Sequence, residues 1–381
     1  MKNRTAIAGI GHTAFAKNIG RPEKQIALEA ILAALDDAGL RAQDIDGLVR
    51  FNLESSTEVE VARSLGIPNL KFFSEVGYGG GSGCAAVFHA AMAVASGVAD
   101  VVVCWRARNR GSGGRPWAKT SWRVEGDGQF FLPFGLVRPV DQIAMVARRY
   151  AHEYGSPPEM LGAVAVACRK HAKHNPHALM REPMSMEDYL GIRMVSDPLR
   201  LFDCCLETDG ALAIVVTSAA RARDLKQRPA YILAGAQGTG PQCVVMANYH
   251  KPVFLETPSL YCARELFGRA GITPQDVDVA QIYDAFTPLV VLSLEEYGFC
   301  GKGEAKDFVK DGALEWPNGR LPVNTSGGSL SEAYVHGFNL ILEGVRQIRG
   351  TSVCAVKDAE VCLVTSGAGV PTSALLLARG H

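Results

Sequence analysis

The sequence predicts an α/β protein built from two similar halves, and three observations lead to this fold class. Short runs of β-branched residues alternate with longer amphipathic stretches, which is typical of alternating strands and helices. The segment DAGLRAQDIDGLV (37–49) has a close echo in RAGITPQDVDVAQI (269–282). In each half a glycine-rich loop then opens a long helical pattern, first in GYGGGSGCAAVFHAAMAVASG and later in NTSGGSLSEAYVHGFNLILEGVRQIRG.

The elements of the first half follow from local patterns. They are predicted to run strand, helix, strand, helix, strand through TAIAGIG (5–11), PEKQIALEAILAALDDAG (22–39, closed by Gly39), DIDGLVRF (44–51), GSGCAAVFHAAMAVASG (81–97) and ADVVVCW (99–105). Residues 107–135 are rich in Gly, Arg and Trp and are expected to form an insertion outside the core.

The repeats also predict the domain organisation. The first half is predicted to span residues 1–248, with a loop or insertion region at about 107–200. The second half is predicted to span residues 249–381, with the junction within 245–258.

Composition and charge narrow the class of protein. Apolar residues make up 48% of the 381 residues and charged residues 20%, an ordinary globular composition. The formal net charge is zero, and no basic stripe indicates nucleic acid or an anionic membrane surface. Apolar runs such as AAMAVASGVADVVV are broken by Gly and Asp well before the length of a membrane span. We therefore expect a cytoplasmic protein.

The cysteines and histidines do not predict a disulfide framework or a metal site. None of the ten cysteines forms a C-x-x-C pair, and several lie in apolar runs, which favours reduced, buried thiols. His171, His174 and His177 are three residues apart, but Asn175-Pro176 interrupts any helix that would align them.

The two glycine-rich loops are candidate binding elements. The start of a helix presents unpaired N–H groups and a partial positive charge, and glycines let a ligand approach the backbone closely. Two such loops facing each other could polarise a carbonyl oxygen. The alternative is that they are tight turns needed only for packing.

The sequence resembles the thiolase superfamily along essentially its whole length, most closely the sterol-carrier-protein-X-like, or lipid-transfer, branch. The segments that carry this resemblance are AIAGIGHTAFAK, SDPLRLFDCCLETDGALAIVV (196–216), QIYDAF (281–286), NTSGGSLSEAYVHG (324–337) and TSGAGVPTSALLL. The resemblance implies a thiolase fold, with two βαβαβαββ halves in a five-layer αβαβα arrangement. It also implies acyl-CoA as substrate with no bound cofactor, a homodimer, and a small partner subunit made of an OB fold and a zinc ribbon.

The family's reactive residues are replaced in this chain. The position of the nucleophilic cysteine aligns with Gly80, and Cys84 lies four residues later, about 6 Å along a helix that rises roughly 1.5 Å per residue. Tyr283 takes the place of the family's Asn or His, and Tyr334 that of its activating histidine. The second cysteine aligns nearest Leu363; Cys362 is one residue away, which on a strand reverses the face.

These replacements predict a change of reaction. Thiolysis needs a nucleophile, whereas retro-aldol cleavage of a β-hydroxyacyl thioester needs only groups that move protons. The pattern resembles the steroid side-chain-cleaving aldolases, in which two tyrosines replace the cysteines, and Tyr283 and Tyr334 match those positions. Tyr334 is expected near the start of a helix, where the helix dipole would favour its anion. The alternative is that both rings only fill space.

Other residues are expected to support the site. Gly80, Gly81, Ser82, Gly327, Gly328, Ser366 and Gly367 are candidate donors of N–H groups to the thioester oxygen. Asp284 is expected to orient Tyr283 or to cap the helix that follows it, and His336 to lie behind the reacting groups. Two other functions stay open: an acyltransferase that uses Cys84 or Cys362, and a non-catalytic acyl-CoA or lipid-binding scaffold.

Overall fold

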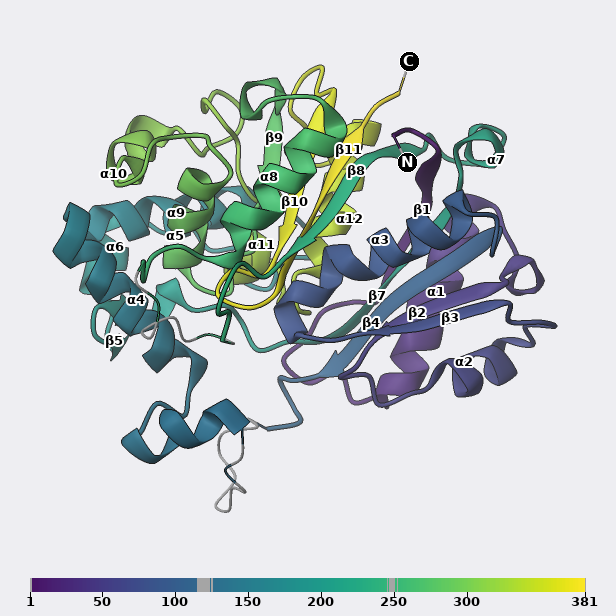
Figure 1. Ribbon diagram of the computed structural model, residues 1–381, viewed down its shortest axis with the longest axis horizontal. Helices are drawn as coiled ribbons and strands as arrows, with labels where there is room; N and C mark the ends of the chain where they lie inside the picture. The colour runs from purple at the N-terminus through teal and green to yellow at the C-terminus, as the bar shows by residue number, and fades with distance from the viewer. Residues whose placement is uncertain are drawn as a thin grey trace.

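A computed structural model describes residues 2–114, 124, 126–244, 246, 251 and 253–380, and its main feature is one mixed sheet. The strands lie side by side in the order β3-β2-β4-β7-β1-β8-β11-β10-β9 (Figure 1). In chain order they are β1 (Thr5–His12), β2 (Gly47–Phe51), β3 (Phe72–Val76), β4 (Val101–Asn109), β7 (Asp209–Ser218), β8 (Ala230–Gly238), β9 (Val279–Gln281), β10 (Val361–Ser366) and β11 (Thr372–Ala378).

The pairing of the strands repeats within this sheet. In the first half β2 is parallel to β4, while β7 is antiparallel to both β4 and β1. In the second half β9 is parallel to β10, while β11 is antiparallel to both β10 and β8. The halves join where Ala6 and Ile7 of β1 pair with Tyr231 and Ala230 of β8. The predicted α/β fold with two similar halves is confirmed.

The helices complete five layers. The outer face of the first half carries α1 (Glu23–Ala38), with α2 (Glu58–Leu65) beside it, and the outer face of the second half carries α8 (Pro258–Ala270). Two helices form the middle layer, α3 (Ser82–Ala95) and α12 (Phe338–Arg349). The middle helices contact each other, and each contacts strands of both halves.

The sequence echo corresponds to the same turn in both halves. The helix of each copy ends at a glycine with positive φ, Gly39 at 73° and Gly271 at 68°, a conformation that glycine adopts without strain. A short 3₁₀ turn follows, closed where Asp44 accepts from the Arg41 N–H (2.8 Å) and Asp276 from the Thr273 N–H (2.7 Å). The repeated Ala-Gly and Gln-Asp pairs are therefore the residues that turn the chain from helix to strand.

The described residues of 110–208, between β4 and β7, form a mainly helical region that shares the largest buried cluster with the sheet (Figure 1). Its elements are α4 (Pro139–Tyr154), α5 (Pro158–Ala172), α6 (Met186–Gly191), β5 (Met194–Ser196) and β6 (Leu199–Arg200). The prediction that residues 107–109 belong to an insertion is wrong, because β4 continues to Asn109. The predicted strand ends before Arg106 because a charged residue is not expected inside a buried strand. Here the side chain of Arg106 is buried in an ion pair with Glu54.

Two predictions concern residues outside the described part of the chain. The insertion prediction includes residues 115–123 and 125, and the division between halves falls at 248–249. Counted by strand pairing, the second repeat begins earlier, with β8 at Ala230.

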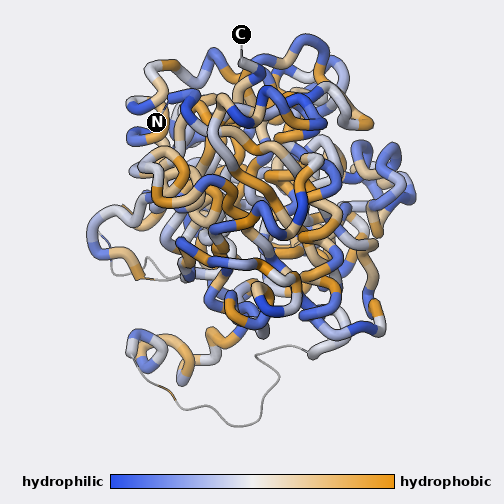
Figure 2. Tube along the Cα trace, turned by 90° about the vertical axis from the view of Figure 1, so that its right-hand side faces the viewer, coloured by the Kyte–Doolittle hydropathy of each residue, from blue (hydrophilic) through white to orange (hydrophobic). Residues whose placement is uncertain are grey.

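The apolar residues gather in the middle of the molecule, as Figure 2 shows by colour. The largest buried cluster combines α3, α12 and the inward faces of strands from both halves. In the described residues no single helix is long and apolar enough to cross a membrane. One bent pair, Gly126–Phe134 with Pro139–Tyr154, meets the length and composition test when taken together.

Candidate active site

Tyr283 and Tyr334 lie next to each other, as the centre of the candidate site. Tyr283 follows β9, and Tyr334 lies in the segment between α11 (Gly328–Ser331) and α12. Their hydroxyl oxygens are 2.8 Å apart, so one phenol donates a hydrogen bond to the other. Tyr283 is fixed by a bond from its N–H to the Thr365 hydroxyl, and Tyr334 by one from its N–H to the Thr208 hydroxyl.

The expectation that Tyr334 lies near the start of a helix is wrong. The helix after the glycines stops at Ser331, and α12 begins only at Phe338. His336 and Gly337 have φ angles of 53° and 74°, left-handed values that interrupt a right-handed helix between the two. Tyr334 is therefore outside the first turn of a helix, the place where the dipole would favour its anion. Burial raises the pKa of both phenols, and that of Tyr283 is raised further by Tyr334.

Tyr283 occupies the space that the side chain of a cysteine at position 80 would need. A Cβ atom built on Gly80 would overlap the Tyr283 hydroxyl and lie 3.0 Å from its ring carbon Cε2. A Cβ on Gly337 would lie 2.8 Å from ring carbon Cδ2. Two glycines from different halves therefore make room for one phenol ring.

Neither alternative thiol is suited to act as a nucleophile. The Cys84 N–H donates to the Ser366 hydroxyl at 2.9 Å, and that hydroxyl lies 3.2 Å from the Cys84 sulfur. Burial raises the pKa of Cys84 to about 12 and that of Cys362 well above its usual value, so both thiols stay protonated. Such thiols are poor nucleophiles.

The loops predicted to donate N–H groups are brought together only in part. The Gly80 loop touches Tyr283, and a Cβ on Gly367 would lie 3.0 Å from Gly81 Cα. Several of the predicted donors already bond within the protein: Gly81 N–H to Tyr78 O, Ser82 N–H to Gly79 O and Gly327 N–H to Asn324 O. A Cβ on Gly328 would meet the Asp284 carboxylate, and one on Gly327 would meet Ala172.

Asp284 caps a helix, but not the one that follows it. Its carboxylate accepts from the N–H groups of Ser329 (2.8 Å) and Leu330 (3.2 Å), at the start of α11. The following helix, α9 (Thr287–Glu296), has no side-chain cap. The alternative that Asp284 caps the helix after it is therefore wrong, because two segments distant in sequence meet here; that Asp284 orients Tyr283 stays a prediction. Burial raises the pKa of Asp284 to about 6, against the effect of these bonds.

His336 lies behind the tyrosine pair, with its ring centre 5.3 Å from that of Tyr334. Its Nδ1 atom accepts two bonds from Arg106, from Nε at 3.0 Å and Nη2 at 2.8 Å. Arg106 in turn donates from Nη1 to Glu54 at 2.5 Å. Sequence reasoning missed Arg106 and Glu54, although a single arginine inside the strand pattern VVVCWRAR is a possible signal of a buried ion pair.

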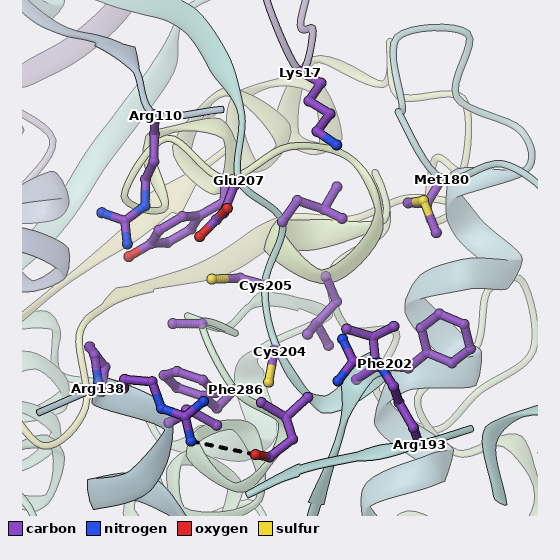
Figure 3. Close-up of a pocket in the computed structure, with 18 of the residues that line it drawn as sticks. Lys17, Arg110, Arg138, Met180, Arg193, Phe202, Cys204, Cys205, Glu207 and Phe286 are labelled. Carbon is purple, nitrogen blue, oxygen red and sulfur yellow. Dashed lines mark hydrogen bonds between the residues drawn. The ribbon is translucent and has the colours of Figure 1, made fainter. Parts of the chain in front are cut away.

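A cavity of about 440 Å³ opens beside Tyr334. Its wall is largely apolar, and positive side chains stand on opposite sides of it (Figure 3). Arg138 and Arg193 lie on one side and Arg110 and Lys17 on the other, with Cys204 and Cys205 between them. Such a cavity can hold an apolar acyl group and bind phosphates at its edge.

The sequence indicates these cavity residues only weakly. Arg110, Arg138 and Arg193 come from separate parts of the region between β4 and β7, so no motif joins them. In the described residues no three His, Cys, Asp or Glu side chains are placed to hold a metal ion.

Comparisons with known proteins match the whole chain. Residues 3–188 match the family model "Thiolase, N-terminal domain", and residues 245–378 match "Thiolase C-terminal domain-like". The chain is 53% identical to a 17-hydroxy-3-oxo-4-pregnene-20-carboxyl-CoA lyase of Mycobacterium tuberculosis, covering 99% of this chain and 100% of that one. It is 51% identical to a steroid side-chain-cleaving aldolase of Thermomonospora curvata, covering 98% and 97%. A solved structure described as "Ltp2-ChsH2(DUF35) aldolase" is 50% identical, with a TM-score of 0.95 over 100% of this chain and 99% of that one.

Proposed function

Because the chain belongs to the thiolase family, we propose that its site keeps an acyl-CoA substrate and replaces attack by a thiol with proton transfer between tyrosines. The protein is an aldolase, a carbon–carbon lyase that cleaves a steroid side chain carried as a CoA thioester. The observation that supports the mechanism is the Tyr283–Tyr334 hydrogen bond of 2.8 Å, in the space that a cysteine at position 80 would need.

The cavity suggests how the substrate lies. The apolar wall takes the ring system, and Arg138 and Arg193, on the side opposite Arg110, take the phosphates of CoA. Tyr334 lines the cavity, whereas Tyr283 lies behind it. We therefore assign the contact with the substrate hydroxyl to Tyr334, and the role of hydrogen-bond partner to Tyr283.

The proposed reaction begins from the fraction of the protein in which one phenol of the pair is ionised and accepts a hydrogen bond from the other; burial keeps this fraction small. The phenolate takes the proton of the β-hydroxyl group, the bond between the α and β carbons breaks, and a ketone forms. The electron pair of that bond becomes the enolate of the thioester. The α carbon then takes a proton back from the pair, which restores the phenolate and releases a short acyl-CoA. No cofactor is needed in this sequence.

The thioester oxygen carries the enolate charge and needs hydrogen-bond donors. The Gly80 loop, which lies against Tyr283, is the proposed source of one donor. That the other predicted loops also donate N–H groups to this oxygen stays a prediction.

We also propose how the enzyme is assembled. One similar structure is described with two components, so this chain is expected to work with a partner subunit, a small protein with an OB fold and a zinc ribbon. The chain is expected to form a homodimer in the cytoplasm, where its free cysteines stay reduced. Full activity of a purified monomer without any partner would contradict both expectations.

The test is a cleavage assay with a tertiary β-hydroxyacyl-CoA that carries a steroid ring system. Wild-type protein, with the partner subunit present, is expected to release a ketone and a short acyl-CoA, both measured by mass spectrometry. Tyr283→Phe and Tyr334→Phe are expected to lose this activity, while Tyr231→Phe, on β8, keeps it. An acyl group found attached to a cysteine during turnover would overturn the mechanism.

A further inference from the structure

Three buried side chains from distant segments form a chain that ends at the tyrosine pair. Glu54 follows β2, Arg106 belongs to β4, and His336 precedes α12. The side chains of Arg106 and Glu54 are 0% and 1% exposed, so no bulk water screens their charges. Glu54 also accepts from the Ala107 N–H, at 3.3 and 3.1 Å, which fixes the carboxylate against β4.

The chemistry of arginine fixes the state of His336. A guanidinium group can only donate hydrogen bonds, so the Nδ1 atom that receives two of them carries no proton. A second proton would place two positive charges side by side in a buried place. Burial, together with Arg106 and Arg110, lowers the pKa of His336 well below its usual value. The imidazole is therefore neutral and has its proton on Nε2.

The order of the three groups gives the chain a direction. The carboxylate of Glu54 lies at the far end, the guanidinium lies between, and the neutral imidazole lies against Tyr334. The Glu54–Arg106 pair has no net charge, which limits the free-energy cost of burying it. Its positive end nevertheless faces the tyrosines, and charges act over longer distances in a buried, low-dielectric region.

The other groups around Tyr334 determine which positive charge Glu54, Arg106 and His336 have to supply. Arg110 lies on the cavity side, with its guanidinium carbon 5.8 Å from the centre of the Tyr334 ring. None of the remaining titratable neighbours, Tyr283, Cys205 and Glu207, can carry a positive charge. Arg106 is thus the cation behind the pair, and Arg110 the cation in front of it.

We propose that the Glu54–Arg106–His336 chain is part of the catalytic machinery, in which Arg106 acts through His336 to stabilise the phenolate of the tyrosine pair. This inference rests on the proposed function, because it assigns a source of positive charge to the singly ionised pair of that mechanism. All three are positioning residues, since none of them is required to touch the substrate.

The test removes the charge of Arg106 without leaving a buried carboxylate unpaired. The double variant Glu54→Gln/Arg106→Met is compared with Arg106→Lys, which keeps a positive charge, and with His336→Asn, since asparagine tolerates the left-handed backbone at this position. In the double variant kcat at pH 7.5 is expected to fall about tenfold or more, with little change in KM, because one pKa unit corresponds to a tenfold change in phenolate population. The rising limb of the rate against pH is expected to move to higher pH.

A second measurement does not depend on activity. The ionisation of Tyr334 is followed by NMR of protein labelled with ¹³C-tyrosine, and Tyr334→Phe identifies its signal. The double variant is expected to ionise at higher pH than wild type, and Arg106→Lys close to wild type. If both titrations and both rate profiles coincide with wild type, the inference is wrong.

The matched control is the Arg349–Asp37 pair, which joins α12 to α1 at 2.7 Å and has a 4% exposed arginine side chain. Asp37→Asn/Arg349→Met is expected to lower stability without moving the pH profile. A shift of the same size in this control would assign the effect to general loosening and overturn the inference. Absence of cleavage by wild-type protein would instead contradict the proposed function, and the NMR titration would still decide the inference.

Discussion

Gly80 and Tyr283 exclude any larger side chain at position 80. The hydroxyl of Tyr283 lies where a Cβ atom on residue 80 would lie, so a cysteine there and this tyrosine position cannot exist together. Two residues distant in sequence thus decide between two kinds of chemistry: a nucleophilic sulfur or a proton-transferring phenol.

Gly80→Ala tests this exclusion directly. A methyl group at position 80 is expected to displace Tyr283, break its 2.8 Å bond to Tyr334 and reduce kcat at least tenfold. Gly268→Ala is the control, because no atom other than the backbone of its own helix lies within 4 Å of a Cβ built there, inside α8. The control is expected to keep full activity, measured in the same cleavage assay. Equal activity of both variants would mean that the tyrosine position is unimportant.

The two phenols are expected to act as one unit. Each single change, Tyr283→Phe or Tyr334→Phe, removes one of the two hydroxyl groups that form the hydrogen bond. It should lower kcat by roughly 10² to 10⁴, the usual contribution of acid–base catalysis. The double variant is expected to lose little more than the worse single variant, because groups that work together are not additive. Steady-state kinetics of all three proteins check this, and fully multiplicative losses would show two independent roles.

The short helix α11 shows how an element can depend on a distant charge. It has only four residues, and its first N–H groups are satisfied by Asp284 from the segment after β9. The sequence pattern of residues 324–349 favoured one helix starting at the glycines, because periodicity does not show where a backbone reverses. The left-handed residues His336 and Gly337 end that pattern, and they place His336 beside Arg106.

Glu332, just after α11, makes stability depend on pH. Its carboxylate accepts from Asn175, Ser326 and Asn339, and burial raises its pKa to about 7 although Arg346 lowers it. The folded protein then binds a proton more tightly than the unfolded chain. The stabilising contribution is therefore complete below about pH 4.5, the value in an unfolded chain, and is lost as pH rises to about 7.

Glu332→Gln is expected to remove this contribution. Between pH 4.5 and 8 the free energy of unfolding is expected to decrease in both proteins. The decrease is expected to be about 3 kcal/mol smaller in the variant than in wild type. Urea unfolding at several pH values measures the difference between the two proteins. The contributions of His12 and His171, whose pKa values are lowered to about 4, cancel in this difference because both proteins contain them. Glu265→Gln, on the exposed side of α8, is expected to follow wild type. Parallel curves for wild type and Glu332→Gln would contradict the assignment.

At the scale of the whole molecule, the sequence predicted the repeat better than it predicted the site. The repeat could be found because the same turn residues, Ala-Gly and Gln-Asp, make the same local bonds in both halves. The tyrosine positions followed from the family motif. The supporting groups did not, because Arg106 meets His336 across 230 residues and Asp284 meets Ser329 across 45, distances over which no local pattern extends.

The joined sheet predicts cooperative unfolding. The halves share the β1–β8 pairing and the middle helices α3 and α12, so neither half has a complete core alone. Calorimetry is expected to show a single transition. Separate fragments 1–229 and 230–381 should fold only when expressed together, as judged by circular dichroism, and an independently folded first fragment would contradict this.

During synthesis the same arrangement delays completion of the core. Helix α3 emerges from the ribosome long before β8, β10 and β11, the strands that later cover its other side. Its alanine- and valine-rich face therefore stays uncovered while more than a hundred further residues are translated. We expect chaperones that bind apolar segments to hold the nascent chain during that time. Faster translation across residues 96–230 would shorten the period in which the chain depends on them.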